Sequence, residues 1–181
     1  AFELARHAIE IDPKSSRGYH ALAVAYWFSH NVPASVEAYE TALSTNPNAT
    51  ELLTDYGLRL AMMGKVNEAQ SMLERSIRQN PMQPGTNRLG LAVCFFEQEK
   101  FEEALSQAQQ IGAPGVVYGY LYEAAALARL GRIHEARSVM SKILKMQPDF
   151  FDNISGDLEK RGLNEMMAEK LIAALQMALS E

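Results

Sequence analysis

The chain has 181 residues, 48% of them hydrophobic and 22% charged, which is enough apolar material for a packed core and excludes a disordered segment. The formal net charge is −5 and the 17 Lys and Arg residues are dispersed, so we expect no nucleic acid partner. No apolar run reaches the roughly 18 to 20 residues that span a bilayer, no signal peptide opens the chain, and the single Cys94 fits a reducing compartment. We therefore expect a cytoplasmic protein with no membrane partner.

The first predicted helix covers residues 1–13 and resembles the second half of a helix hairpin whose first half is missing. Because the chain also opens with Ala, we expect a fragment of a larger protein that is cut inside a repeat. The unpaired helix should expose Phe2, Ala5 and Ile9. An apolar edge of this kind is expected to dock on upstream chain or on a second copy, which predicts self-association.

Three prolines at a constant interval mark two complete repeats. Pro13, Pro47 and Pro81 are each 34 residues apart, and agreement of two successive periods is hard to obtain by accident. We therefore expect repeat units over residues 14–47 and 48–81, each of them a hairpin of two helices.

The hairpin of residues 48–81 illustrates how such a unit packs. Met63 and Gly64 are expected to turn the chain between its two helices. Gly57 and Ala69 fall where the helices should cross, and a larger side chain there would push the helices apart. Such a hairpin cannot bury its apolar face alone, so it needs neighbours on both sides.

Two further repeats follow, but their pattern is displaced by one residue from the 34-residue spacing. The extra residue is expected to lie in the connection at residues 82–84. The unit of residues 82–115 should end early, because Gly112 to Gly115 combines the strongest helix breakers in four residues. We expect the stack of helices to bend there. Residues 116–148 complete the last repeat.

Residues 149–181 depart from the repeat pattern. A short helix is expected over residues 154–160, Gly162 should break it, and Asn164 can cap a final helix that runs through Ser180. Its apolar face is expected to seal the last hairpin, and the alternative is a separate helix that binds a partner. The residues of that face are Met166, Met167, Leu171, Ile172, Leu175 and Leu179.

Residues with chemical potential do not form a recognisable catalytic or metal pattern. His134 and Glu135 begin the zinc-protease motif, but Ser138 stands where the second histidine would share the helix face. Cys94 lies inside a predicted helix, where a small buried hydrophobe is the expected role rather than a nucleophile. We therefore expect no cofactor, no metal site and no enzyme activity in these residues.

The order of small and large apolar residues, with a proline every 34 positions, resembles the tetratricopeptide repeat. The resemblance implies an all-α fold, a right-handed α-α superhelix or solenoid with a C-terminal capping helix. It also implies the following division of the chain: a half repeat 1–13, repeats 14–47, 48–81, 82–115 and 116–148, and capping helices in 149–181.

In proteins of this family the first helix of each hairpin lines a concave surface that contacts a peptide or partner protein. Carrying these positions over by phase predicts an unusually apolar binding surface, suited to an amphipathic helix or an extended apolar segment. The alternative is that these side chains pack inside a tightly wound superhelix or against the last helix. The predicted positions are Arg17, His20, Val24, Trp27, Phe28, Thr54, Leu58, Met62, Leu89, Val93, Phe96 and Leu121.

A narrower resemblance rests on the Pro-Met-Gln-Pro break at residues 81–84, on residues 89–105 and on the exit at residues 146–150. Together with the terminal helix, these segments are similar to the C-terminal repeat region of bacterial regulators that carry a class III adenylate cyclase or a winged-helix DNA-binding domain. The resemblance implies a protein-interaction scaffold within a larger signalling or transcription regulator. The alternative is the non-catalytic C-terminal region of a nucleotide cyclase.

Overall fold

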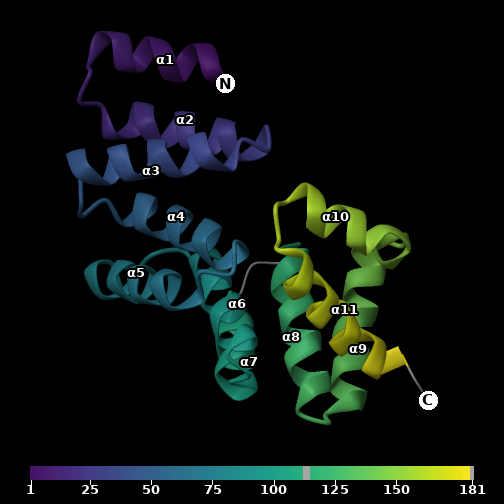
Figure 1. Cartoon of the computed structure of the whole chain (residues 1–181). Helices are drawn as coiled ribbons and strands as arrows, with labels where there is room; N and C mark the ends of the chain where they lie inside the picture. The colour runs from purple at the N-terminus through teal and green to yellow at the C-terminus, as the bar shows by residue number, and fades with distance from the viewer. Residues whose placement is uncertain (112–114, 180–181) are drawn as a thin grey trace.

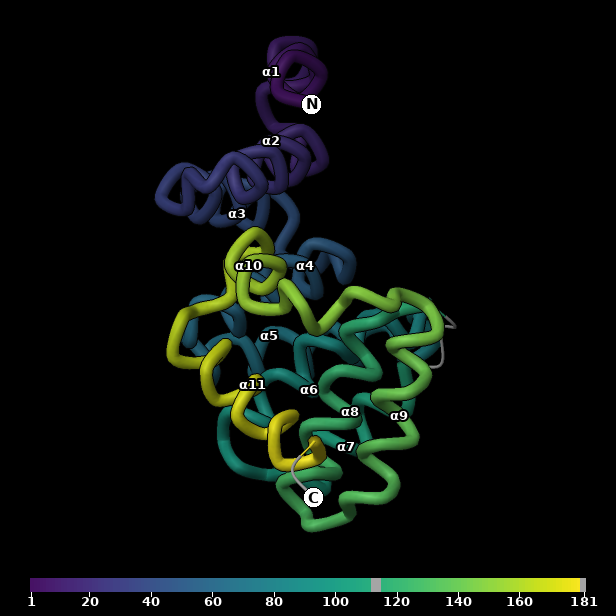
Figure 2. The backbone as a smooth tube through the Cα atoms, turned by 90° about the vertical axis from the view of Figure 1, so that its right-hand side faces the viewer, coloured from purple at the N-terminus to yellow at the C-terminus, as the bar shows by residue number. Residues whose placement is uncertain are grey.

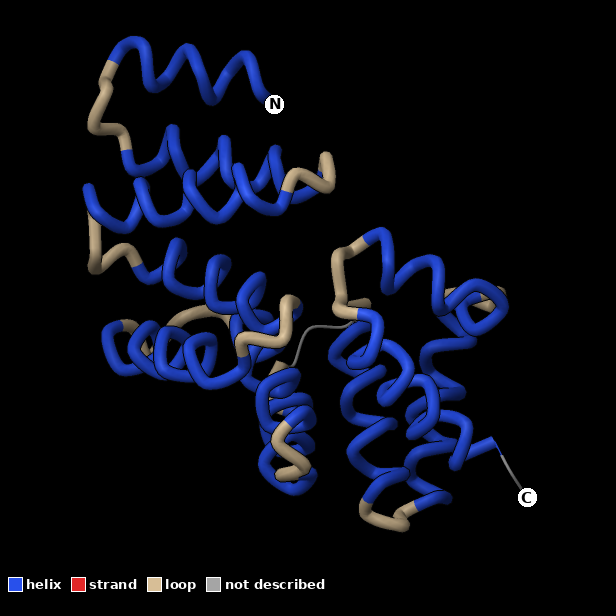
Figure 3. The backbone as a smooth tube through the Cα atoms, in the orientation of Figure 1, coloured by secondary structure: helices blue, strands red, loops and turns tan. Residues whose placement is uncertain are grey.

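The computed structural model describes residues 1–111 and 115–179, and over this part of the chain the structure is helical without strands (Figures 1 and 3). The α-helices are α1 (Phe2–Ile11), α2 (Ser16–Phe28), α3 (Val32–Thr45), α4 (Thr50–Met62), α5 (Val66–Gln79), α6 (Leu89–Glu97), α7 (Phe101–Gln109), α8 (Val117–Arg129), α9 (Ile133–Met146), α10 (Ile154–Lys160) and α11 (Glu165–Leu179). Two short 3-10 helices, η1 (Gly85–Arg88) and η2 (Phe150–Asn153), precede α6 and α10. The expected all-α class is confirmed.

The helices from α2 to α9 form four hairpins that stack in succession, with α1 packed on α2 (Figure 1). Within each hairpin the two helices pack along each other, and the second helix of each hairpin contacts the first helix of the next one. The result is the expected superhelical solenoid, because no hairpin can bury its apolar face without its neighbours.

The crossing of the central hairpins depends on two glycines and a leucine. A Cβ atom added to Gly57 on α4 would lie 2.7 Å from Cγ of Leu73, and one added to Gly90 on α6 would lie 2.8 Å from Cδ1 of the same leucine. Leu73 therefore fills a niche between α4 and α6 that only glycine leaves open. Ala69 is fully buried beside it, as predicted for the crossing point.

The apolar edge of α1 differs from the sequence-based prediction. Ala5 is buried, the Phe2 ring lies 5.0 Å from the Tyr26 ring, and Ile9 packs against Gly18. Helix α2 therefore covers the face of α1 that the sequence predicts to be exposed. The exposed apolar side chains of α1 belong to the opposite face, where Leu4 is 78% and Ile11 73% exposed.

The predicted bend at Gly112 to Gly115 lies outside the described residues except for Gly115, and so does the predicted end of the last helix at Ser180. The short helix α10 has the predicted bounds, and Gly162 ends it with a φ angle of +82°, which is the left-handed region that glycine tolerates. The Asn164 side chain caps α11 by accepting a hydrogen bond from the backbone N–H of Met166.

Helix α11 packs across α8 and α9 (Figure 2), but its buried face is rotated from the predicted one. Met166 and Leu179 are exposed, because the helix has a period of 3.6 residues and these two positions lie on the outer edge of the buried stripe. The buried residues of α11 are Met167, Leu171, Ala174, Leu175 and Ala178.

Candidate concave binding site

A groove with a volume of about 530 Å³ lies between α1 and α2. Small residues form its floor, whereas Leu4, Val24 and the cationic Arg17 border it. We call this hollow the α1–α2 groove, and its lining residues are Ala1, Leu4, Ala5, Ala8, Ser15, Arg17, Gly18, His20, Ala21 and Val24. A floor of alanine and glycine leaves room for a large apolar side chain of a partner.

Two smaller hollows continue the same surface along α4 and α6. One, of about 200 Å³, lies between α4 and α6 and is lined by Thr54, Asp55 and Leu58 among others. The other, of about 80 Å³, is shared by α4, α6, α8 and α10 and also touches Leu58. His20 of the α1–α2 groove is hydrogen-bonded to Asp55, and the two smaller hollows share Leu58, so the three hollows lie next to one another.

The half-buried carboxylate of Asp55 links the helices of this surface where α2, α3 and α4 meet. Asp55 Oδ2 is 3.0 Å from Nε2 of His20 and 2.5 Å from the hydroxyl of Tyr39, which donates to it. Asp55 Oδ1 accepts a hydrogen bond of 3.0 Å from the guanidinium of Arg59. One side chain therefore links three successive helices, and charge-assisted hydrogen bonds of this type are stronger than neutral ones.

The pKa of Asp55 reflects these partners. Burial by itself would raise the pKa of this carboxyl, but the hydrogen bond from His20, the positive charge of Arg59 and the hydrogen bond from Tyr39 outweigh burial and hold the pKa below its usual value. Burial next to this carboxylate raises the pKa of the Tyr39 hydroxyl. Asp55 is thus an ionised group with three hydrogen-bond partners.

Arg59 carries the network on to the aromatic residues at the end of α2. Its guanidinium carbon lies 5.2 Å from the ring centroid of Trp27 and 5.3 Å from that of Phe28. Both distances are within the range of a cation–π interaction. Phe28 is still 56% exposed, so this aromatic face remains open beside a charged group.

The predicted site residues fall into an open and a covered set. Arg17, His20 and Val24 line the α1–α2 groove, and Phe28 is exposed. Leu58, Met62 and Leu89 line the two smaller hollows. The side chains of Trp27, Thr54, Val93, Phe96 and Leu121 are buried, although Thr54 and Val93 also contribute to the lining of these hollows.

The buried residues among the predicted site residues are shielded from solvent in two different ways. Phe96 packs within the core, 5.5 Å from the ring of Phe101 and 5.7 Å from that of Tyr122, so removal of its side chain would disturb α6, α7 and α8 rather than a binding surface. Trp27 is only 3% exposed, because the turn after α10 covers it and the backbone carbonyl of Arg161 accepts a hydrogen bond of 3.0 Å from its indole. The alternative of packing against the last helices therefore describes Trp27 in this structure.

Sequence reasoning missed Asp55 and Arg59, the two charged residues at the centre of the site. A signal was available, because Asp and Arg four positions apart share one helix face and form an ion pair. Asp55 is also the one charged residue in the apolar half of the first helix of its repeat, between Leu53 and Leu58. A charge at such a position predicts a buried partner.

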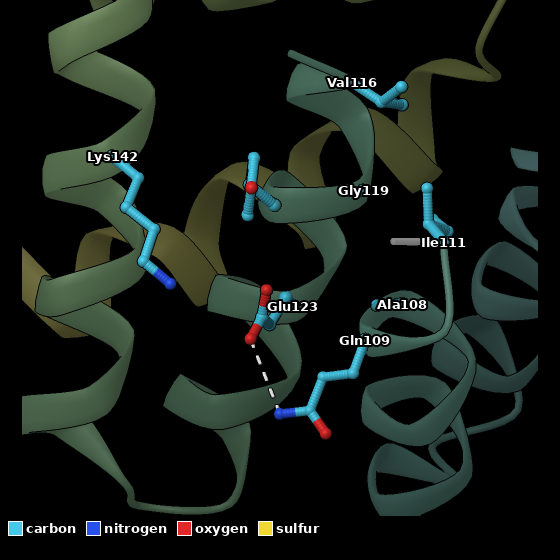
Figure 4. Close-up of a pocket in the computed structure, with 8 residues that line it drawn as sticks. Ala108, Gln109, Ile111, Val116, Gly119, Glu123 and Lys142 are labelled. Carbon is cyan, nitrogen blue, oxygen red and sulfur yellow. Dashed lines mark hydrogen bonds between the residues drawn. The ribbon is translucent and has the colours of Figure 1, made fainter. Parts of the chain in front are cut away.

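A separate hollow of about 220 Å³ lies between α7 and α8, next to α9 (Figure 4). Its polar groups are paired with one another: Gln109 donates to Glu123 at 3.4 Å, and the Lys142 ammonium lies 5.6 Å from the Tyr120 ring centroid. Each of the two charged side chains that line this hollow, Glu123 and Lys142, therefore already contacts a neutral neighbour.

Metal and thiol chemistry have no evident site in the part of the chain that the structure describes. Over residues 1–111 and 115–179, no group of three or more His, Cys, Asp or Glu side chains could hold a metal ion. Cys94 is fully buried, as predicted, and burial raises the pKa of its thiol to about 12, which keeps it protonated and unreactive. Within the same residues, no helix combines the length and apolar character that a bilayer span requires.

The geometry defines a class of protein: a solenoid of helix hairpins with a hollowed inner face. Residues 54–116, from α4 to the start of α8, match the family model described as tetratricopeptide repeat. A comparison with curated protein sequences gave no match.

Solved structures show the same fold over nearly the whole chain. YrrB, described as a tetratricopeptide repeat protein with an unusual peptide-binding site, has a TM-score of 0.67 at 20% identity, with 99% of this chain and 97% of YrrB covered. PilW, a type IV pilus biogenesis factor, has a TM-score of 0.73 at 19% identity over 97% of this chain and 88% of its own. PilF from Pseudomonas aeruginosa has a TM-score of 0.69 at 19% identity, covering 97% and 77%. The chain therefore has the fold of tetratricopeptide repeat proteins.

Proposed function

We propose that this chain is a protein-interaction scaffold that binds an apolar segment of a partner protein in the α1–α2 groove, without a reaction of its own. The observation that carries the proposal is the open groove of about 530 Å³, whose floor of Ala and Gly lies beside the predicted contact residues Arg17, His20 and Val24. The inner face of the solenoid continues from this groove toward Leu58, which suits a partner of several residues.

The charge at the border of the groove indicates which partner segment fits. Arg17 is exposed and makes no ion pair within residues 1–111 and 115–179, whereas His20 is already bonded to Asp55. A carboxylate of the partner can therefore pair with Arg17 while a large apolar side chain fills the floor. We propose a segment in which Asp or Glu lies close to such an apolar residue.

A peptide library tests this proposal directly. Random 12-residue peptides displayed on phage are selected on the purified chain, and the dissociation constants of the selected peptides are measured by calorimetry. Replacement of Ala21 by Trp fills the groove from an exposed position and should weaken binding at least tenfold, which corresponds to about 1.4 kcal/mol. Ala173→Trp, on the exposed face of α11, is the matched control and should bind as the wild type does. Equal affinity of both variants for every selected peptide would refute the proposal that the α1–α2 groove binds the partner segment.

We also propose self-association through the exposed apolar side chains of α1, which are Leu4 at the border of the α1–α2 groove and Ile11 outside the groove. Light scattering over a hundredfold dilution should show an average mass that falls on dilution, and Ile11→Glu, at an exposed residue that does not line the α1–α2 groove, should give the monomer mass throughout. Met82→Glu, at an exposed residue distant from α1 in the sequence, is the control and should still associate. A monomer mass for the wild type at every concentration would exclude the association.

The biological setting of the scaffold follows from the narrower resemblance alone. We propose an arm of a cytoplasmic bacterial regulator, with the non-catalytic region of a nucleotide cyclase as the alternative. The support is the set of segments around residues 81–84, 89–105 and 146–150. Sequencing the gene beyond both ends tests it: a recognition helix favours a transcription regulator, two metal-binding aspartates favour the cyclase, and the absence of either output domain refutes both.

A further inference from the structure

Residues 154–164, which comprise α10 and the turn into α11, lie over the inner face of the solenoid and reach back to α2 and α4 (Figure 1). We call this segment the elbow. Leu158 and Leu163 of the elbow are buried, and both line the small hollow that also contains Leu58 and Val93. The elbow thus occupies the surface that sequence analysis assigned to a partner.

Few bonds hold the elbow on this surface. The backbone N–H of Asn164 donates to the carbonyl of Met62 at 2.8 Å, and the indole of Trp27 donates to the carbonyl of Arg161 at 3.0 Å. The guanidinium carbon of Arg161 lies 4.2 Å from the ring centroid of Tyr118. The hydroxyl of Tyr118 donates to Asp157. These are the types of contact by which a bound peptide is held, namely backbone hydrogen bonds and aromatic anchors.

The fit between the elbow and the inner face is incomplete. A hollow of about 80 Å³, lined mainly by apolar side chains, stays open between the elbow and helices α4, α6 and α8. The elbow therefore leaves part of the inner face uncovered.

We propose that the elbow is a built-in ligand of the inner face and competes there with the partner segment, so that the site opens fully when the elbow leaves Trp27. This inference rests on the proposed function for the identity of the competitor. A partner segment that extends from the α1–α2 groove past Asp55 reaches Leu58. This residue lines the same hollow as Leu158 and Leu163 of the elbow. Affinity for a long partner then depends on the release of residues 154–164, whereas affinity for a short one does not.

A matched pair of glycine variants tests the docking, with Trp27, the only tryptophan of the chain, as the reporter. A Cβ atom at Gly162 would lie 2.6 Å from Cζ2 of Trp27, so Gly162→Ala should push the elbow away from the indole. Gly131 has a similar positive φ angle, but a Cβ atom there meets nothing within 4 Å. Gly131→Ala therefore imposes the same backbone strain without the collision.

Acrylamide quenching of Trp27 fluorescence is the first measurement. The quenching constant should rise at least twofold in Gly162→Ala and stay at the wild-type value in Gly131→Ala. A synthetic peptide with the elbow sequence ISGDLEKRGLN, added in trans, should bind Gly162→Ala at least tenfold more tightly than the wild type and restore the protection of Trp27. Unchanged quenching, or equal peptide affinity for both proteins, would overturn the proposal.

Hydrogen exchange of the wild type gives a test that does not depend on folding of a variant. The Asn164 amide, bonded to Met62, should exchange at least tenfold faster than the amide of Leu171 in the buried part of α11. Equal exchange would show that the elbow opens only with the whole domain.

The Ala21→Trp variant distinguishes failure of the proposed groove from failure of the proposed elbow docking. It blocks the α1–α2 groove, but it should leave the effect of the elbow peptide on Trp27 quenching unchanged.

Discussion

Replacement of Leu73 by Ala is expected to lower the free energy of unfolding by about 3 to 4 kcal/mol, because it creates a cavity between three helices. Leu73 is almost fully buried, and its side chain fills the space against Gly57 of α4 and Gly90 of α6. Neither glycine has a side chain that could move into the cavity, so the site cannot collapse easily. Urea unfolding followed by circular dichroism measures the change.

The control for Leu73 is Leu144, which also lies on the second helix of a hairpin but is 41% exposed. Leu144→Ala should cost about 0.5 kcal/mol or less, since surface substitutions seldom cost more. A similar loss for both variants would mean that the niche between the glycines does not determine how the hairpins pack.

The position of Leu73 also predicts how the protein unfolds. In a solenoid successive repeats are coupled mainly through their neighbours, so weakening the junction of α4, α5 and α6 leaves the repeats on either side joined mainly through the elbow. Leu73→Ala should therefore broaden the thermal transition as well as lower its midpoint. If the transition stays as sharp as in the wild type, cooperativity does not depend on this junction.

The repeats could be predicted because their signal is local and periodic. Gly57 and Ala69 mark a helix crossing whose steric requirement is the same in every unit, and a proline every 34 residues fixes the phase. The short helix at residues 154–160 and the break at Gly162 were equally clear from composition. Such features depend on neighbours in the sequence.

The location of the elbow could not be predicted, because it depends on contacts across the whole chain. The bond between Trp27 and Arg161 joins residues 134 positions apart, and no local pattern specifies it. The face of α1 was misassigned for a related reason, since Phe2 and Ile9 look exposed until α2 is placed against them. The position of a residue within its repeat indicates on which side of the solenoid it lies. It does not indicate which other segment of the chain covers that side.

Replacement of Asp55 by Ala should lower the free energy of unfolding by about 2 to 3 kcal/mol. The loss leaves the guanidinium of Arg59, which is 12% exposed, without its carboxylate, and it removes the acceptor of the Tyr39 hydroxyl. The value lies below that of a fully buried ion pair, because Asp55 itself retains some contact with solvent. Asp152→Ala, at an exposed aspartate of η2, is the control and should change stability by less than about 0.5 kcal/mol.

The lowered pKa of Asp55 predicts that the stability of the fold decreases at acidic pH. Because the folded pKa of Asp55 lies below its unfolded value of about 3.8, the ionised carboxylate stabilises the fold above that pH, and the contribution is lost as the pH falls further. The difference in stability between the wild type and Asp55→Ala should therefore narrow as the pH falls below about 3.8 in urea unfolding experiments. A difference that widens in acid would mean that burial, not the hydrogen bonds, dominates the pKa of Asp55. Because Asp55 joins α2 and α3 to α4, its protonation should also loosen the border of the α1–α2 groove and weaken peptide binding over the same pH interval.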